Sequence, residues 1–266
     1  MNSSQTRAAH LTRICILSFL LAFLAGCDNN NALNSLADES SKNARTEAAI
    51  MAMDEGDYQK ARNILLKLTR KHPNDAKLHQ YLASAYSGLA GLDTLNFLVI
   101  IDALDDSGNS GSIDMVGLVL GDGGGRVTAV GAAEKSGHIE NAIEALNAIA
   151  RNSDQTIQRG LLGVVHVALL LGEIIMDDLR AESIILTEQG ISNLYGRQQA
   201  DFSGVGEHIL GQIDDSLDYI GEAVLALTSL SKKNDLSDDF VKFRNDIKSH
   251  EGPLRAPDLE NYINGL

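Results

Sequence analysis

Residues 42–89, KNARTEAAIMAMDEGDYQKARNILLKLTRKHPNDAKLHQYLASAYSGL, decide the fold because they predict three helices separated by two turns. Gly56 allows the first turn, since glycine adopts backbone conformations that other residues avoid. Pro73 ends the second helix, because proline cannot donate the backbone hydrogen bond that a helix interior needs. Asn74 or Asp75 can then cap the third helix through a side-chain oxygen.

Small and large apolar residues follow helical spacing around these turns. In a first helix over about 42–55, Ala48, Ala49 and Ala52 allow a neighbouring helix to approach closely. In the second helix, apolar residues recur at i, i+7 and i+10 and form a stripe that fills the groove between helices. The residues expected to shape and pack these hairpins are Gly56, Tyr58, Ala61, Leu65, Leu68, Pro73, Leu82, Ala83 and Tyr86.

This arrangement resembles the tetratricopeptide repeat. Residues 56–73 match the second helix and terminal proline of that repeat, and residues 82–86 match the first helix of the next one. The resemblance implies an all-α fold of helical hairpins with long inserts, a degenerate α-solenoid, because the family's period of about 34 residues is not sustained. An unrelated helical hairpin is the alternative.

The same spacing recurs twice further along the chain. A second copy, shifted by 81 residues, consists of Gly137, Ile139, Ala142, Leu146 and Ile149. A weaker third copy consists of Ile220, Ala223, Leu227 and Leu230. Gly137 of the second copy corresponds to Gly56 of the first.

Helices are also predicted for most of the remaining chain. The apolar stretch 160–176 contains His166 and three glycines, and at about 17 residues it is expected to be a buried central helix rather than a membrane span. Further helices are expected over 93–104, 178–195 and 205–233, from a cap at Ser237 to near Gly252, and from Pro257 onward, while 105–126 forms two loops around a short helix. No sustained alternating pattern predicts a β-sheet.

The N-terminus predicts export and a lipid anchor. The apolar run 14–25 would span only about 18 Å as a helix, too short for a membrane core of about 30 Å, so it fits a signal peptide. Its end, Leu24-Ala25-Gly26-Cys27, resembles the lipobox of bacterial lipoproteins, which implies a covalent lipid on Cys27. An ordinary signal peptide with an incidental cysteine is the alternative.

Three regions follow from this interpretation: a signal peptide (1–26), a lipidated N-terminus and flexible tether (27–43), and one helical domain (44–266). The lipid would hold the chain in the cell envelope, facing the periplasm. Asp28 after the modified cysteine resembles lipoproteins of enteric bacteria that stay at the inner membrane, so we favour the inner membrane over the outer one.

The composition narrows the classes of partner. The chain has a formal charge of −14, and removal of residues 1–26, with Arg7 and Arg13 and no acidic residue, leaves −16. Such acidity argues against nucleic acid and anionic lipid headgroups as partners, because both are polyanions. The absence of tryptophan further argues against a site that stacks nucleobases.

No catalytic motif, metal-ligand spacing or cofactor fingerprint emerges, so the chain is interpreted as a non-enzyme without cofactor or metal. Helical hairpins build grooves that hold peptides, which predicts an adaptor or assembly factor that binds another envelope protein. By repeat geometry, Arg45, Asn63 and His79 are the candidate partner-binding residues. The alternative function is a periplasmic small-ligand-binding lipoprotein that resembles the T component of TRAP-type transporters, with 93–104 and 160–176 lining its cavity.

Overall fold

The computed structural model describes residues 41–92, 117, 120–121, 125–149, 152–196, 198–230, 235–248 and 250–266. Cys27, the signal peptide, nearly all of the tether and the expected helix 93–104 lie outside the described residues. The chain divides into two units, residues 1–45 and residues 46–266, and each is described by itself.

Helices form nearly all of the described secondary structure, so the fold is all-α. They are α2 (Lys42–Asp54), α3 (Tyr58–Lys71), α4 (Ala76–Leu89), α7 (Ala129–Asn147), α8 (Ser153–Asp178), α9 (Glu188–Tyr195), α10 (Glu207–Leu230), α11 (Asp235–Ile247) and α12 (Ala256–Asn264). Two three-residue strands, β1 (Arg126–Thr128) and β2 (Ser183–Ile185), pair antiparallel, with Val127 opposite Ile184.

The first turns form where the sequence predicts them. Gly56 has φ +77°, a conformation that glycine adopts without strain. Asp57 and Asp75 cap α3 and α4, because their carboxylates accept the backbone N–H of Lys60 at 3.0 Å and of Leu78 at 3.3 Å. These local bonds fix both helix starts.

Of the residues expected to pack, Ala49, Ala52, Ala61, Leu65, Leu68, Leu82 and Ala83 are buried. Tyr58 and Tyr86 are half-buried, and Ala48 is exposed. The ring of Tyr58 lies directly on α4: a Cβ added to Gly88 would come within 2.2 Å of it. A small residue at position 88 is therefore what lets these two helices approach.

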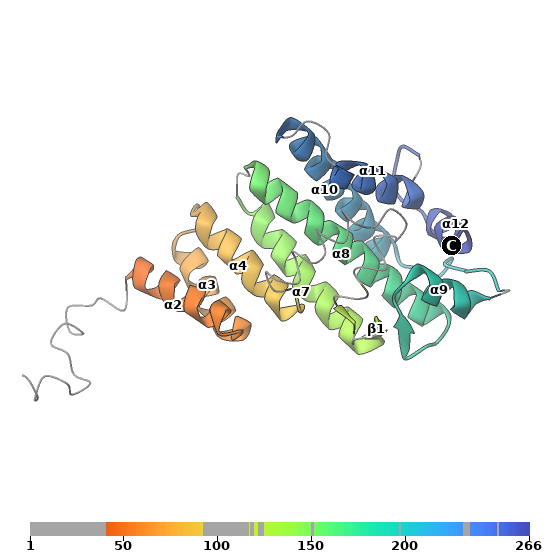
Figure 1. Cartoon of the computed structure of the whole chain (residues 1–266). Helices are drawn as coiled ribbons and strands as arrows, with labels where there is room; N and C mark the ends of the chain where they lie inside the picture. Colours follow the sequence, from red (N-terminus) through yellow and green to blue (C-terminus); the bar gives the residue numbers. More distant parts are fainter. Residues whose placement is uncertain are drawn as a thin grey trace, which may run out of the picture. The chain divides into compact units, whose positions relative to one another are not determined.

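Within the unit 46–266, the long helices lie side by side in chain order (Figure 1). Contacts join α3 to α4, α4 to α7, α7 to α8, and α8 to α10. Among the described helices, α8 is the one long and apolar enough to cross a membrane, yet 89% of its most apolar 18-residue window is buried in the protein. The prediction of a buried central helix over 160–176 is confirmed.

Two sequence predictions are wrong at the level of single elements. Gly137 lies inside α7 rather than in a turn, so the second copy of the hairpin is not formed. Residues 178–195 are not one helix, because α8 ends at Asp178 and β2 and α9 follow. The reversal uses Arg180 at φ 52°, with the N–H of Ala181 bonded to the carbonyl of Met176 at 2.8 Å.

The C-terminal helices follow the predictions more closely. Helix α10 covers most of the expected 205–233, and Pro257 lies in the first turn of α12, where its missing N–H costs little. Ser237, however, lies within α11 instead of capping it, since that helix begins two residues earlier, at Asp235.

Candidate functional site

A polar pocket of about 200 Å³ lies between α7, α8 and α10. We call it the acidic pocket, because three of its lining residues are carboxylic acids and none is Lys or Arg. Its lining consists of Glu140, Ile143, Glu144, Asn147, His166, Gln212, Asp215, Ser216 and Tyr219. Its volume is below the range of about 300–1,000 Å³ that is usual for drug-sized ligands.

Close packing of α8 on α10 sets the floor of the acidic pocket. A Cβ added to Gly163 would lie 2.8 Å from the backbone oxygen of Ser216, and one added to Gly160 would lie 2.2 Å from the Cβ of Ala223. Both glycines therefore allow the two backbones to approach. This approach brings His166 of α8 beside Ser216 of α10.

His166 forms the buried base of the acidic pocket. It is only 3% exposed, and its Nδ1 lies 3.0 Å from the Oγ of Ser216. Its Nε2 is buried and has no hydrogen-bond partner among the described residues. Burial lowers the pKa of His166 to about 4, although the nearby carboxylate of Glu140 acts in the opposite direction. The ring is therefore neutral at neutral pH, with one nitrogen free to accept or donate a hydrogen bond.

One wall of the acidic pocket is held by internal hydrogen bonds. Gln212 donates to Glu140 at 2.7 Å, and the side-chain amide of Asn147 donates to the hydroxyl of Tyr219 at 3.2 Å. Behind this wall the buried Arg159 pairs with Glu222, donates to Asn147 at 2.6 Å and stacks on the ring of Tyr219. The guanidinium thus holds the wall in place.

Two carboxylates at the rim are not held in this way. The side chains of Glu144 and Asp215 are exposed and make no hydrogen bond or ion pair with any described residue. The pKa of Asp215 is raised, first by partial burial and then by the neighbouring charges of Asp214 and Asp218. The ionised carboxylate of Asp215 therefore lowers the stability of the fold at neutral pH.

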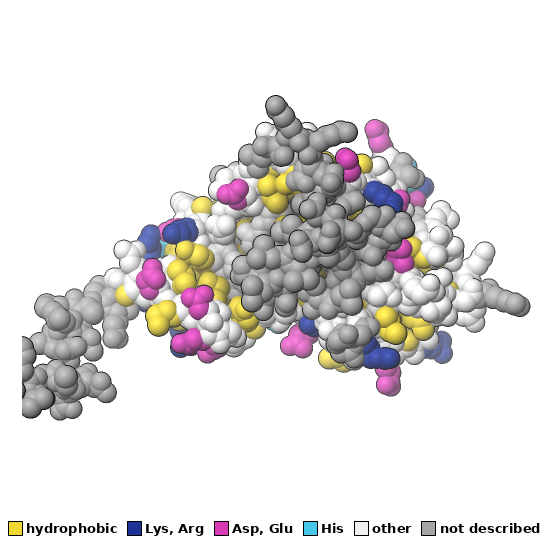
Figure 2. Space-filling view, viewed as in Figure 1, with side chains coloured by type: hydrophobic (Ala, Val, Ile, Leu, Met, Phe, Trp, Pro, Cys, Tyr) yellow, Lys and Arg dark blue, Asp and Glu magenta, His cyan; other side chains and the backbone are white. Residues whose placement is uncertain are grey.

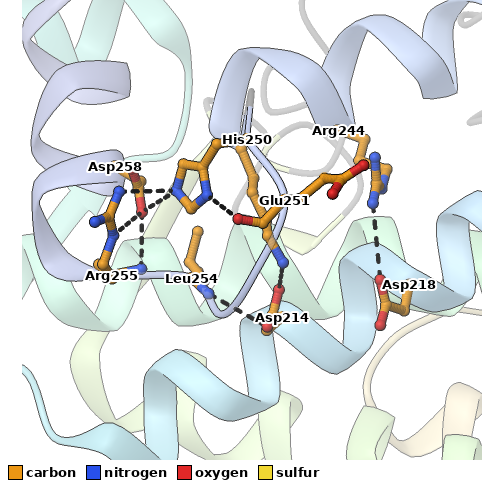
Figure 3. A network of polar contacts seen from close by, with 9 residues as sticks. Asp214, Asp218, Arg244, His250, Glu251, Leu254, Arg255 and Asp258 are labelled. Atoms are coloured by element: carbon orange, nitrogen blue, oxygen red, sulfur yellow. Dashed lines mark hydrogen bonds and ion pairs between the residues drawn. The ribbon is translucent and has the colours of Figure 1, made fainter.

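The neighbouring carboxylates of α10, Asp214 and Asp218, are in the reverse situation (Figure 3). Asp214 pairs with Lys248, which is only 7% exposed, and also accepts the N–H of Leu254 at 3.3 Å. Asp218 lies 3.8 Å from Arg244. We call these residues, together with His250, Arg255 and Asp258, the C-terminal network.

Within the C-terminal network, His250 joins the chain before α12 to its first turn. Its Nε2 lies 2.8 Å from the carboxylate of Asp258, and its Nδ1 lies 2.9 Å from the carbonyl oxygen of Glu251. The hydrogen bond to Asp258 raises the pKa of His250, as does the one to the Glu251 carbonyl. Every charged group named here has an opposite charge in reach.

The acidic pocket therefore carries carboxylates without a Lys or Arg in its lining. Two rim carboxylates can accept from an ammonium or guanidinium group, and a neutral imidazole nitrogen can accept at the base. Ile143, which is buried, supplies an apolar surface for an aliphatic stem. No group of three or more His, Cys, Asp and Glu side chains suited to a metal ion occurs among the described residues.

The residues that the sequence proposed for partner binding lie elsewhere. Arg45 is half-buried on α2, and Asn63 is exposed on α3, where it accepts from Gln59 at 3.3 Å and from Arg62 at 3.2 Å. His79 is 8% exposed, and its Nε2 lies 3.0 Å from the carbonyl oxygen of Pro73. His79 thus stabilises the turn between α3 and α4 and offers little surface to a partner.

Sequence reasoning missed the acidic pocket because its residues come from three helices. Glu144, His166 and Asp215 are far apart in the chain and form no motif. One signal was available: His166 stands within the most apolar stretch of the domain, where a polar side chain needs a reason.

The alternative function required 93–104 and 160–176 to line a cavity. The first segment lies outside the described residues, and the apolar side chains of the second pack in the core between α7 and α10. No family model, no curated protein and no solved structure matches this chain.

Proposed function

We propose that the protein is a lipid-anchored adaptor of the bacterial envelope that binds a basic segment of another protein in the acidic pocket. One observation carries the proposal: the carboxylates of Glu144 and Asp215, which pair with no described residue, line a pocket whose lining also includes the buried His166. Unpaired charge is costly for a fold. A ligand that relieves this cost binds favourably.

A Lys or Arg side chain matches this arrangement step by step. Its aliphatic stem packs on Ile143, and its charged end lies between the carboxylates of the rim. If the proton of His166 is on Nδ1 and donates to Ser216, the imidazole is neutral and does not repel the cationic group at the rim. The acidic pocket is small enough to hold one such side chain.

The anchor and the pocket serve the same role in this proposal. A lipid on Cys27 keeps the helical domain at the membrane, which raises its effective concentration for partners there. No step of chemistry is required of the pocket, so the proposal remains that of a binding protein.

Site-specific photo-crosslinking in the native membrane tests the proposal. A crosslinking residue in place of Glu144, at the rim, removes one carboxylate but leaves Asp215 to bind the cation, and it is expected to capture one envelope protein through a segment rich in Lys or Arg. The matched control places the same residue at Glu134, an exposed glutamate of the same helix outside the acidic pocket.

A second substitution makes the test specific for charge. Adding Asp215→Asn is expected to reduce the crosslinked product several-fold, whereas Asp238→Asn, on the exposed surface of α11, is expected to leave it unchanged. A product that forms equally well from position 134, or that is insensitive to Asp215→Asn, would overturn the proposal.

A further inference from the structure

The acidity of the chain hides one strongly basic helix. In its 14 residues α3 carries Lys60, Arg62, Lys67, Arg70 and Lys71 and no acidic residue. Residues 42–90 contain eight Lys and Arg and five Asp and Glu, whereas residues 91–266 contain 12 and 28. The protein is therefore electrically asymmetric, with its positive part close in sequence to Cys27.

Four of these cations share one face of α3. With 3.6 residues per turn, Lys60, Lys67, Arg70 and Lys71 fall within an arc of about 100°. The buried face of the helix, formed by Ala61, Leu65 and Leu68, points the other way. We call the four residues the cationic stripe. Figure 2 shows Lys and Arg side chains gathered over one end of α3.

The cationic stripe is not used within the described part of the protein. All four side chains are exposed, and none makes a hydrogen bond or ion pair with a described residue. Arg62, which is outside the stripe, differs, because its guanidinium lies 5.9 Å from the ring centre of Tyr86. Exposed like charges on one face repel one another, so the stripe has no evident role in folding.

We propose that the cationic stripe of α3 lies against anionic lipid headgroups of the membrane that holds the anchor, and turns the acidic remainder of the domain away from that membrane. This inference rests on the lipid anchor of the proposed function, and it is independent of the acidic pocket. It adds a second, non-covalent contact that sets how the domain is oriented.

The position of α3 in the chain favours a lipid surface over an acidic protein. Fourteen residues lie between Cys27 and Lys42, and a chain of that length reaches at most about 50 Å. The anchor thus limits how far α3 can move from the headgroups and raises the effective concentration of α3 at the lipid surface. At physiological ionic strength charges act over about 8 Å. A stripe that touches the anionic surface is therefore attracted to it, whereas an acidic body held further out is not repelled by it.

The residue types support the same choice. Three of the four cations are lysines, which act as mobile point charges rather than as rigid forks for a defined carboxylate. A diffuse layer of phosphate groups makes no demand on geometry, and several Lys and Arg beside an anchor form the second signal that stabilises membrane attachment.

Lysine footprinting on vesicles tests this inference. The full lipidated protein, purified from membranes, is reconstituted into phosphatidylcholine vesicles and into vesicles that also contain phosphatidylglycerol. Acylation of individual lysines is then read by mass spectrometry. Lys60, Lys67 and Lys71 are expected to react several-fold more slowly on the anionic vesicles, and high salt is expected to restore their reactivity. Lys242, exposed on α11, is the internal control and should not change.

Each contrary result has a separate meaning. Equal reactivity on the two kinds of vesicle would overturn the inference, and protection on both that grows with protein density would assign the stripe to a second copy of the chain instead. Failure of the protein to stay on phosphatidylcholine vesicles would refute the lipid anchor, and this inference with it. Loss of the crosslink at Glu144 would concern the acidic pocket alone.

Discussion

Helix α10 carries carboxylates on two sides, and the two sides differ in what faces them. In the C-terminal network, Asp214 meets Lys248 and Asp218 meets Arg244. In the acidic pocket, the adjacent Asp215 meets no cation and its pKa is raised. Two neighbouring aspartates thus have opposite effects on the stability of the fold. Since the fold pairs Asp214 and leaves Asp215 unpaired, the proposal assigns a ligand to Asp215.

The two sides also contain histidines in opposite states. Burial in the acidic pocket lowers the pKa of His166, whereas contact with Asp258 in the C-terminal network raises that of His250. The acidic pocket favours a neutral imidazole, and the C-terminal network favours a charged one. Substitutions at these residues test whether the two sites differ in this way.

The largest expected effect is the pH dependence that comes from His166. Its pKa is about 4 in the folded chain and about 6.5 in the unfolded chain, so only the unfolded chain takes up a proton between these values. The contribution of the neutral His166 to the unfolding free energy is fully present above pH 6.5. It decreases by about 3 kcal/mol as the pH falls towards 4. The difference in unfolding free energy between wild type and His166→Gln, from urea titrations, should therefore shrink on acidification.

His250→Gln is the counterpart and should show the opposite sign. A raised pKa means that His250 stabilises the fold below pH 6.5 and loses this contribution as the pH rises through its folded pKa. The unfolding free energy of the wild type should therefore exceed that of this variant most clearly at acidic pH. Parallel pH profiles for the two variants would contradict the contrast between the two sites.

Removing the charge of Asp214 should destabilise the fold by about 2 to 3 kcal/mol, because Asp214→Asn leaves the buried ammonium of Lys248 without its counter-ion. Urea-induced unfolding at neutral pH measures the loss. Replacing both partners, as in Asp214→Leu with Lys248→Met, should recover much of it, since no charge is then left buried. A double variant as unstable as the single one would count against the pair.

The glycine that lets α8 approach α10 should also matter. Gly163→Ala places a Cβ 2.8 Å from the backbone oxygen of Ser216, so the helices must separate, at a cost of about 1 to 2 kcal/mol. Gly137→Ala is the matched control, because nothing lies within 4 Å of its added Cβ in the interior of α7. That change should stabilise the protein by about 0.5 to 1 kcal/mol. Thermal unfolding of the two variants should therefore shift in opposite directions.

The smallest effect belongs to Asp215. Since its folded pKa is raised, its ionised form opposes folding at neutral pH, and Asp215→Asn should stabilise the domain by a few tenths of a kcal/mol, the scale of exposed charges. The gain should disappear at a pH where Asp215 is protonated. A loss of stability in urea titration would show that Asp215 already has a partner.

The sequence predicted those parts of the fold that are encoded locally. The turn at Gly56 and the cap at Asp75 depend on residues close together in the chain, and 160–176 is apolar enough to predict its own burial. The cap at Asp57 was not predicted, although it uses the same three-residue spacing. Gly137 matches Gly56 in spacing but lies inside α7, because spacing alone does not distinguish a glycine within a helix from a glycine in a turn. The strand β2 has only three residues, too few for an alternating pattern.

The candidate site could not be predicted in the same way. The pairing of Asp214, and the lack of it at Asp215, depend on a cation 34 residues further along the chain, at Lys248. The net charge gives only a total for the whole chain. The structure, by contrast, shows a basic face on α3 and an acidic pocket on α7 and α10. Lipidation of Cys27 and binding to an envelope protein remain predictions from the sequence.

The small ladder of β1 and β2 bears on the order in which the domain folds. Two strands of three residues are marginal by themselves, and here the whole of α7 and α8 separates them in the chain. Closing so long a loop costs entropy unless the intervening helices have already brought its ends together. We therefore expect the ladder to form last on folding, and the amide proton of Leu186, bonded to the carbonyl of Gly125, to exchange with solvent well before those in the middle of α8.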